Sequence, residues 1–108
     1  MNCIFCKILN KEIPSEMVYE DELCYAFLDI NPEQKGHTLI IPKKHFENIF
    51  DENADTNIIK HIHGVAVALA REAKDKYGCQ SVKIVQLNGE CAGQTVFHYH
   101  VHVIPYYA

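Results

Sequence analysis

The sequence has no apolar run that approaches the roughly 20 residues needed to cross a bilayer. It has no run of basic residues either, and its net charge is −4, from 14 Asp and Glu residues against 10 Lys and Arg. Binding to a nucleic-acid backbone calls for a basic patch, so this balance argues against such a partner. A small anionic ligand fits, because a pocket in an acidic protein can be locally positive. We therefore expect neither a membrane nor a nucleic acid as partner.

The N-terminus lacks the charged leader, apolar block and small-residue cleavage site of a secreted precursor. This indicates a cytoplasmic protein, whose five cysteines at positions 3, 6, 24, 79 and 91 are expected as thiols or ligands rather than disulfides. Repeats, low-complexity stretches and linkers are also missing, and 108 residues suit one domain. We expect a single domain over residues 1–108, with a small core that would gain from dimerisation.

The apolar periodicity defines the elements. It predicts a short helix over residues 4–10, a long helix from the polar segment 51–55 to Tyr77, and strands over residues 17–20, 23–28, 37–41, 81–87 and 97–104. Gly78 suits the left-handed residue that ends a helix. Ile59 and Val67 widen the apolar surface of the long helix beyond one stripe, which favours a dimer. This order predicts an α+β fold, with a five-stranded antiparallel sheet, one long helix and one short helix.

Three histidines alternate with apolar residues near the C-terminus: His98, His100 and His102. Successive side chains of a strand point to opposite faces, so the three share one face at intervals of about 6–7 Å. Tyr99, Val101 and Val103 point the other way, toward a core. One histidine in such a strand would be a solvated face residue, whereas three in register indicate chemistry near neutral pH.

These imidazoles suit either a metal or covalent catalysis. A His-x-His pair on a strand is a zinc geometry, but the outer two of the three lie roughly 13 Å apart, so at most two would share an ion. A nucleophilic role uses all three, because one ring attacks while its neighbours orient it and polarise the substrate. The preceding loop suits an anion: Gly93 lets the backbone approach closely, and N–H groups near Gln94 and Thr95, with the Thr95 hydroxyl, would bind a phosphate. Such a loop is also common for purely structural reasons.

Cys3 and Cys6 form a Cys-x-x-Cys pair, which in a cytoplasmic chain indicates redox chemistry or a metal. Their position before any predicted strand argues against a thioredoxin-like redox site. A closed zinc site needs two further ligands, for which His45 is one candidate. The alternative is two buried thiols without a metal.

The segment His98-Tyr99-His100-Val101-His102-Val103-Ile104 resembles the signature of the histidine triad (HIT) superfamily. Further segments resemble its nucleotide-binding, Hint-like branch: Ile4-Phe5-Cys6-Lys7-Ile8, Phe27-Leu28-Asp29-Ile30, Gly36-His37-Thr38-Leu39-Ile40-Ile41-Pro42-Lys43-Lys44-His45 and Gly93-Gln94-Thr95-Val96-Phe97. The resemblance covers essentially the whole chain, and its triad with the Gly-Gln lead-in is highly specific.

The resemblance implies a homodimer whose two sheets join into one. It implies a site for a purine nucleoside 5′-monophosphate or its amide, and hydrolysis at the α-phosphorus of nucleoside phosphoramidates such as adenosine 5′-monophosphoramidate. No cofactor is required for that catalysis. By analogy with bacterial-type members, a structural zinc would be held by Cys3, Cys6, His45 and His98.

The resemblance also implies a role for each residue that matches a functional position of the family. His100 would be the nucleophile that forms a nucleotidyl-histidine, His102 and Thr95 would contact the α-phosphate, and His98 would tune His100. His37 would orient His100 through its second nitrogen. Asp29 would bind the ribose and Asn88 the ribose or phosphate side. The remaining implied nucleotide contacts are Ile4, Phe5, Ile8, Ile30, Leu39, Gly93, Gln94 and Val96. From the residues alone, Asp29 would equally suit a strand-end cap and His37 a surface loop.

Three other functions compete with phosphoramidate hydrolysis. A dinucleoside polyphosphate hydrolase, as in the Fhit-like branch, would use the same triad with a nucleotide as leaving group. A nucleotide-sensing or scaffold dimer would bind without much catalysis, although a binder does not require His100. A structural zinc protein is the third alternative.

Overall fold

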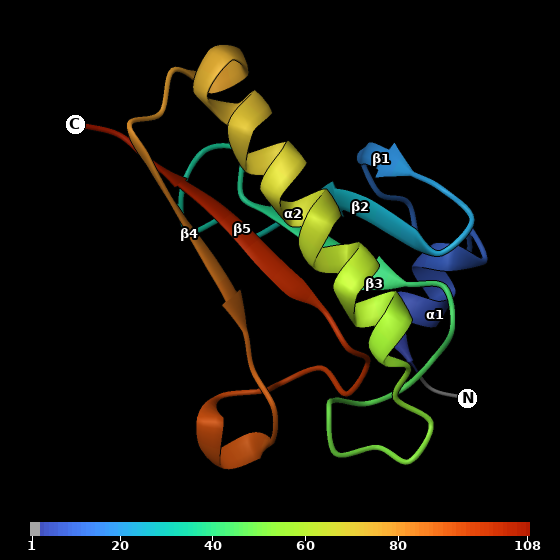
Figure 1. Cartoon of the computed structure of the whole chain (residues 1–108). Coiled ribbons are helices and arrows are strands. Elements are labelled where there is room, and N and C mark those ends of the chain that lie inside the picture. Colours follow the sequence, from blue (N-terminus) through green and yellow to red (C-terminus); the bar gives the residue numbers. More distant parts are fainter. Residues whose placement is uncertain (1–2) are drawn as a thin grey trace.

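The computed structural model describes residues 3–108 (Figure 1). Met1 and Asn2, the first two residues of the predicted domain, lie outside the described residues. Two helices and a short 3-10 turn accompany five strands: α1 Ile4–Leu9, β1 Met17–Glu20, β2 Cys24–Leu28, β3 Thr38–Pro42, α2 Thr56–Tyr77, β4 Ser81–Gln86, η1 Glu90–Ala92 and β5 Val101–Tyr106. All neighbouring strands are antiparallel, in the order β1-β2-β3-β5-β4. The predicted α+β fold is therefore confirmed.

Local signals fix both ends of α2. The side chain of Asp55 accepts hydrogen bonds from the N–H groups of Asn57 and Ile58, which satisfies two donors of the first turn. At the other end Gly78 adopts φ of 70°, and its N–H donates to the Lys74 carbonyl oxygen. Both ends lie where the sequence predicts them, because each depends only on its neighbours in the chain.

The sheet has two apolar faces, and each is covered by a different helix. The long helix α2 crosses one face, where its buried residues pack on Ala26, Ile40 and Val101 (Figure 1). The short helix α1 packs on the other face, where Phe5 and Ile8 meet Phe27, Leu39 and Ile41. Alternate residues of each strand thus belong to different clusters, as the strand period requires. The face that carries α1 is the one that matters for function.

The last strand differs from its predicted range, since it spans Val101–Tyr106 rather than residues 97–104. A strand needs a partner, and both partners of β5 end early. β4 stops at Gln86, opposite Val101, and β3 stops at Pro42, whose nitrogen carries no hydrogen for a ladder. The Tyr99 N–H instead donates to the carbonyl oxygen of Phe46 at 2.8 Å. Residues 97–100 consequently lie outside the sheet, and the chain bends at residues 97 and 98.

Among residues 3–108, neither helix is long and apolar enough to cross a membrane.

Candidate active site

The three histidines lie on the α1 face, as the alternation predicts. Tyr99, Val101 and Val103 are buried on the α2 face. His102 pairs with Leu39 of β3 and so joins the α1 face at the middle of the sheet. The rings of His100 and His102 have their centroids 5.0 Å apart.

His100 has the environment of a nucleophile. Its Nδ1 lies 2.7 Å from the carbonyl oxygen of His98, and because a carbonyl only accepts, Nδ1 carries the proton. The neutral ring then has an unprotonated Nε2 with its lone pair free. Burial lowers the pKa of His100, which keeps the ring neutral at pH 7, and the ring of Phe5 packs edge-on against it at 5.0 Å. His98 thus acts on His100 through its backbone, while its own ring points elsewhere.

His37 lies beside His102 rather than His100. Its Nε2 is 3.0 Å from Nδ1 of His102 and 3.6 Å from a carboxylate oxygen of Asp29. The expectation that His37 orients His100 is therefore wrong, because the sheet register places His102 next to the residues that follow His37. Burial, with His100 and His37 adding to its effect, lowers the pKa of His102 to about 4. Burial likewise lowers the pKa of His37, against the opposing charge of Asp29.

The loop before the histidines is a braced turn. The buried side chain of Gln94 donates to the carbonyl oxygens of Glu47 and Val96 and accepts from Asn48 and from the Gly89 N–H. The Gln94 N–H itself donates to the Gly89 carbonyl oxygen. That donor is therefore already used inside the turn, and a phosphate contact from N–H groups near Gln94 and Thr95 stays a prediction.

Gly93 also has a structural task, because its φ of 103° is a conformation that side chains disfavour. Its N–H donates to the Glu90 carbonyl oxygen, so it too is used inside the turn. Thr95 is exposed and Val96 is partly buried. Thr95 and Val96 also line a hollow beside Cys3 and Ile4, which leaves this stretch of the loop open to a ligand.

Asn88 is engaged within the protein. Its amide exchanges two hydrogen bonds with the amide of Gln86, and its oxygen also accepts the N–H of Ile49. It therefore braces the end of β4, and its implied contact with a ribose or phosphate stays a prediction.

The residues expected around the base divide into two groups. Phe5, Ile8 and Leu39 are buried together on the α1 face, next to His100 and His102. Ile4 is 47% exposed and Ile30 is 85% exposed, so these two lie at the outer edge.

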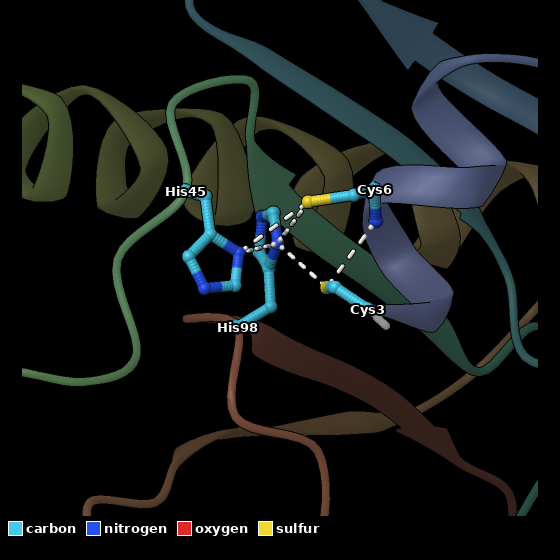
Figure 2. Close-up of side chains that lie close together, drawn as sticks. All are labelled: Cys3, Cys6, His45 and His98. Atoms are coloured by element: carbon cyan, nitrogen blue, oxygen red, sulfur yellow. Dashed lines mark hydrogen bonds between the residues drawn. The ribbon is translucent and has the colours of Figure 1, made fainter. Parts of the chain in front are cut away.

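Two cysteines and two histidines form a separate cluster next to the triad. Figure 2 shows Cys3 and Cys6 from the start of α1 pointing toward His45 and His98, which lie in segments that follow β3 and precede β5. The Nδ1 atoms of the two histidines are 3.0 Å apart. The Nδ1 of His98 lies 3.3 Å from Sγ of Cys3 and 3.6 Å from Sγ of Cys6, and the Nδ1 of His45 lies 3.4 Å from Sγ of Cys6.

The comparison with known proteins follows this geometry. A family model described as HIT domain matches residues 10–108. The chain belongs to the HIT family. An uncharacterized HIT-like protein of Methanocaldococcus jannaschii is 53% identical over 105 residues, which cover 97% of this chain and 79% of that protein.

Two relatives of this HIT chain have names that state an activity. Adenosine 5′-monophosphoramidase HNT1 of Saccharomyces cerevisiae is 42% identical over 95% of this chain and 61% of its own length. Adenylylsulfatase HINT3 of Arabidopsis thaliana is 36% identical over 96% of this chain and 52% of its own length. Among solved structures, a Zn-bound histidine triad family protein of Mycobacterium smegmatis superposes with a TM-score of 0.93 at 36% identity, over 98% of this chain and 76% of that one.

The cysteine–histidine cluster of this HIT chain fits a zinc ion. Tetrahedral zinc, at about 2.3 Å from sulfur and about 2.0–2.1 Å from nitrogen, holds sulfur and nitrogen about 3.5 Å apart and two nitrogens about 3.3 Å apart. The observed separations of 3.3–3.6 Å and 3.0 Å match this arrangement. Two histidines and two cysteines are also a common structural zinc set.

The protonation of His98 agrees with a ligand role. Its Nε2 lies 2.9 Å from the Pro42 carbonyl oxygen, so Nε2 carries the proton and Nδ1 turns its lone pair toward the thiols. Burial, and then a hydrogen bond with Cys3, raise the pKa of Cys6 to about 11, so the Cys6 thiol is neutral on its own. A divalent cation reverses that preference and binds a cysteine as its thiolate.

Several supporting groups of this HIT site have no signal in the sequence. The carbonyl oxygens of Pro42 and His98 fix the tautomers of His98 and His100, and Glu47 and Asn48 brace Gln94. Backbone carbonyls are present at every residue, so only the fold shows which of them matter.

Proposed function

We propose that this HIT chain hydrolyses nucleoside 5′-phosphoramidates, with a purine nucleotide in the site and His100 as nucleophile. The observation that carries the proposal is the fixed tautomer of His100, because the 2.7 Å contact with the His98 carbonyl leaves Nε2 free for attack. The names of the yeast and Arabidopsis relatives support an adenylate as the reacting group.

The reaction would proceed in two displacements. In the first, Nε2 of His100 bonds to the α-phosphorus and the P–N bond breaks, with its electron pair on the amine nitrogen. The amine nitrogen takes one proton from the solvent before it leaves, because the single proton of a neutral imidazole such as His102 is not acidic near pH 7. The Nε2–H of His102, 5.0 Å from His100 between ring centroids, would donate a hydrogen bond to the phosphate.

In the second displacement a water oxygen bonds to phosphorus and the P–Nε2 bond breaks, with its electron pair returning to His100. One proton of the water goes to the solvent, which replaces the proton taken up by the amine, and the other stays on the phosphate. The products are a nucleoside 5′-monophosphate and an amine. Two steps with a good nucleophile replace one difficult step.

The nucleotide would extend across the α1 face. We place the base against Phe5, Ile8 and Leu39, which are buried together beside the triad. Asp29 follows β2 on the same side and lies 3.6 Å from His37, which suits a ribose hydroxyl near the phosphate. Thr95 is exposed at the end of the braced loop and would contact the phosphate. A homodimer that joins two sheets is part of the proposal.

Zinc would have a structural role. Cys3, Cys6, His45 and His98 would hold it, and when bound it supplies a rigid link between the start of α1 and the segment before β5. No step of the proposed reaction passes through the ion.

The test compares wild-type protein with His100→Ala on adenosine 5′-monophosphoramidate, following the release of AMP. We expect the variant to lose at least about 1,000-fold in kcat. A matched control is His63→Ala, an exposed histidine of α2 that should leave the rate unchanged. Mass spectrometry of quenched wild-type protein should show the nucleotide attached to a histidine.

Two outcomes would overturn the proposal. Equal rates for wild type and His100→Ala would remove His100 as nucleophile. No AMP from the amide, with rapid turnover of a dinucleoside polyphosphate or of adenylyl sulfate, would keep the nucleophile and assign another leaving group.

A further inference from the structure

The loop between β2 and β3 brings a main-chain donor to His37. The N–H of Glu33 lies 3.0 Å from Nδ1 of His37. An amide N–H can only donate, so Nδ1 of His37 must be the unprotonated nitrogen of the ring. In the neutral ring the single proton is then on Nε2.

The same logic passes to the next ring. Nε2 of His37 lies 3.0 Å from Nδ1 of His102, so its proton points at that nitrogen, which accepts. The single proton of a neutral His102 is then on Nε2, the nitrogen that faces away from His37. Both rings are buried or partly buried in surroundings that disfavour the charged form.

This direction also argues against a metal at the second cluster of possible ligands, formed by Asp29, His37 and His102. A metal there would need an unprotonated Nε2 on His37, while Glu33 already requires an unprotonated Nδ1 on the same ring. Both conditions together would leave an imidazolate. The His37–His102 contact is therefore a hydrogen bond between two neutral rings and not part of a metal site.

We propose that Glu33 is a positioning residue, whose N–H fixes the proton direction in the His37–His102 pair so that His102 presents an N–H at Nε2 to the substrate. The tautomers follow from the structure alone, while the effect on rate rests on the proposed function. Without this donor, His37 is free to carry its proton on Nδ1, and His102 would then lose its proton from Nε2.

The side chain of Glu33 holds that N–H in place. Its carboxylate accepts a hydrogen bond from the Tyr106 hydroxyl of β5 and pairs with Lys83 of β4 at 3.2 Å. Two residues further on, the carbonyl oxygen of Lys35 accepts from the Tyr107 hydroxyl at 2.6 Å. These contacts fix the loop to β4, to β5 and to Tyr107, the residue that follows β5.

The first test needs no substrate. Two-bond ¹H–¹⁵N correlation spectra of the wild-type protein at pH 7 assign the protonated nitrogen of each histidine. We expect Nε2–H for both His37 and His102, and Nδ1–H for His100. A spectrum with Nδ1–H on His37, or with unprotonated Nε2 on His102, would overturn the proposal.

The second test uses two variants of one residue. Glu33→Pro removes the N–H, whereas Glu33→Gln keeps it together with an acceptor for Tyr106. For Glu33→Pro we expect mixed tautomers at His37 and His102, a kcat about 10- to 100-fold lower and a KM within about threefold, because a misdirected hydrogen-bond donor stabilises the transition state less. Glu33→Gln should match wild type in both tautomers and rate.

Wild-type tautomers in a folded Glu33→Pro would overturn the proposal, whatever its rate. If Glu33→Pro fails to fold, the wild-type spectrum decides the matter by itself. Correct tautomers in a protein that does not cleave the phosphoramidate would contradict only the proposed substrate.

Discussion

His98 and His102 lie four residues apart in the same segment, but their imidazoles contact different partners. His98 is fully buried, donates from Nε2 to a carbonyl oxygen and turns Nδ1 toward two thiols and a second imidazole. His102 is partly exposed and turns Nδ1 toward His37, whose Nε2 in turn lies near the carboxylate of Asp29. Burial lowers the pKa of each to about 4, so charge does not separate them.

The partners separate them. The Pro42 carbonyl oxygen accepts from Nε2 of His98, so Nδ1 of His98 has a lone pair for an ion. His37 donates to Nδ1 of His102, so Nε2 of His102 carries an N–H for the substrate. His100 lies between the two regions and takes its own tautomer from the His98 backbone. The cysteine–histidine cluster should therefore govern stability, and the His37–His102 pair should govern the hydrogen bond that His102 donates to the substrate.

The largest expected effect comes from breaking the cysteine–histidine cluster. Cys6→Ser removes one of four ligands, and we expect bound zinc to fall well below one ion per chain. Because ion binding contributes directly to folding, the free energy of unfolding should drop by about 3 kcal/mol or more, with Tm lower by roughly 10 °C. Metal analysis and thermal unfolding measure the two quantities.

The matched control for this prediction is Cys91→Ser, because Cys91 is an exposed thiol outside the cluster. It should change neither zinc content nor Tm. Full zinc occupancy and an unchanged Tm in Cys6→Ser would contradict a structural metal at this cluster.

The sequence predicts those features of the fold and site that depend on neighbouring residues, but not those that depend on strand pairing. The ends of α2 depend on Asp55 and Gly78, and the shared face of the histidines depends on alternation, so both follow from local pattern. The start of β5 depends on where its partner strands stop, and the choice of His102 over His100 as the neighbour of His37 depends on register. The Gln94 side chain joins residues 47, 48, 89 and 96, which a sequence pattern does not place together.

A smaller effect should come from titrating the His37–His102 pair. An unfolded histidine takes up a proton near pH 6.5, whereas folded His102, with its pKa of about 4, does so only in stronger acid. The unfolded chain therefore binds the extra proton between these values, and stability falls as pH decreases from about 6.5 to 4. Urea unfolding from pH 7 to 4 should show wild type losing about 2 kcal/mol more than His102→Asn. Parallel curves for the two proteins would mean that His102 is not held neutral by the fold.

The smallest effect is expected at a histidine–carboxylate pair remote from both regions. His61 of α2 lies 2.6 Å from Asp21, in the turn between β1 and β2. Burial acts to raise the pKa of Asp21, but hydrogen bonds from His61, the Leu23 N–H and Tyr19 outweigh it and hold that pKa well below its usual range.

His61→Ala removes one of those donors and leaves the backbone bonds of the turn in place. We expect a loss of about 1 kcal/mol in the free energy of unfolding at pH 7, with the rate of AMP release unchanged within about twofold. His63→Ala on the same helix is exposed and should change neither quantity. A large loss of rate in His61→Ala would mean that contacts on the α2 side of the sheet affect the triad. The comparison of the cysteine–histidine cluster with the His37–His102 pair would then not be enough to account for activity.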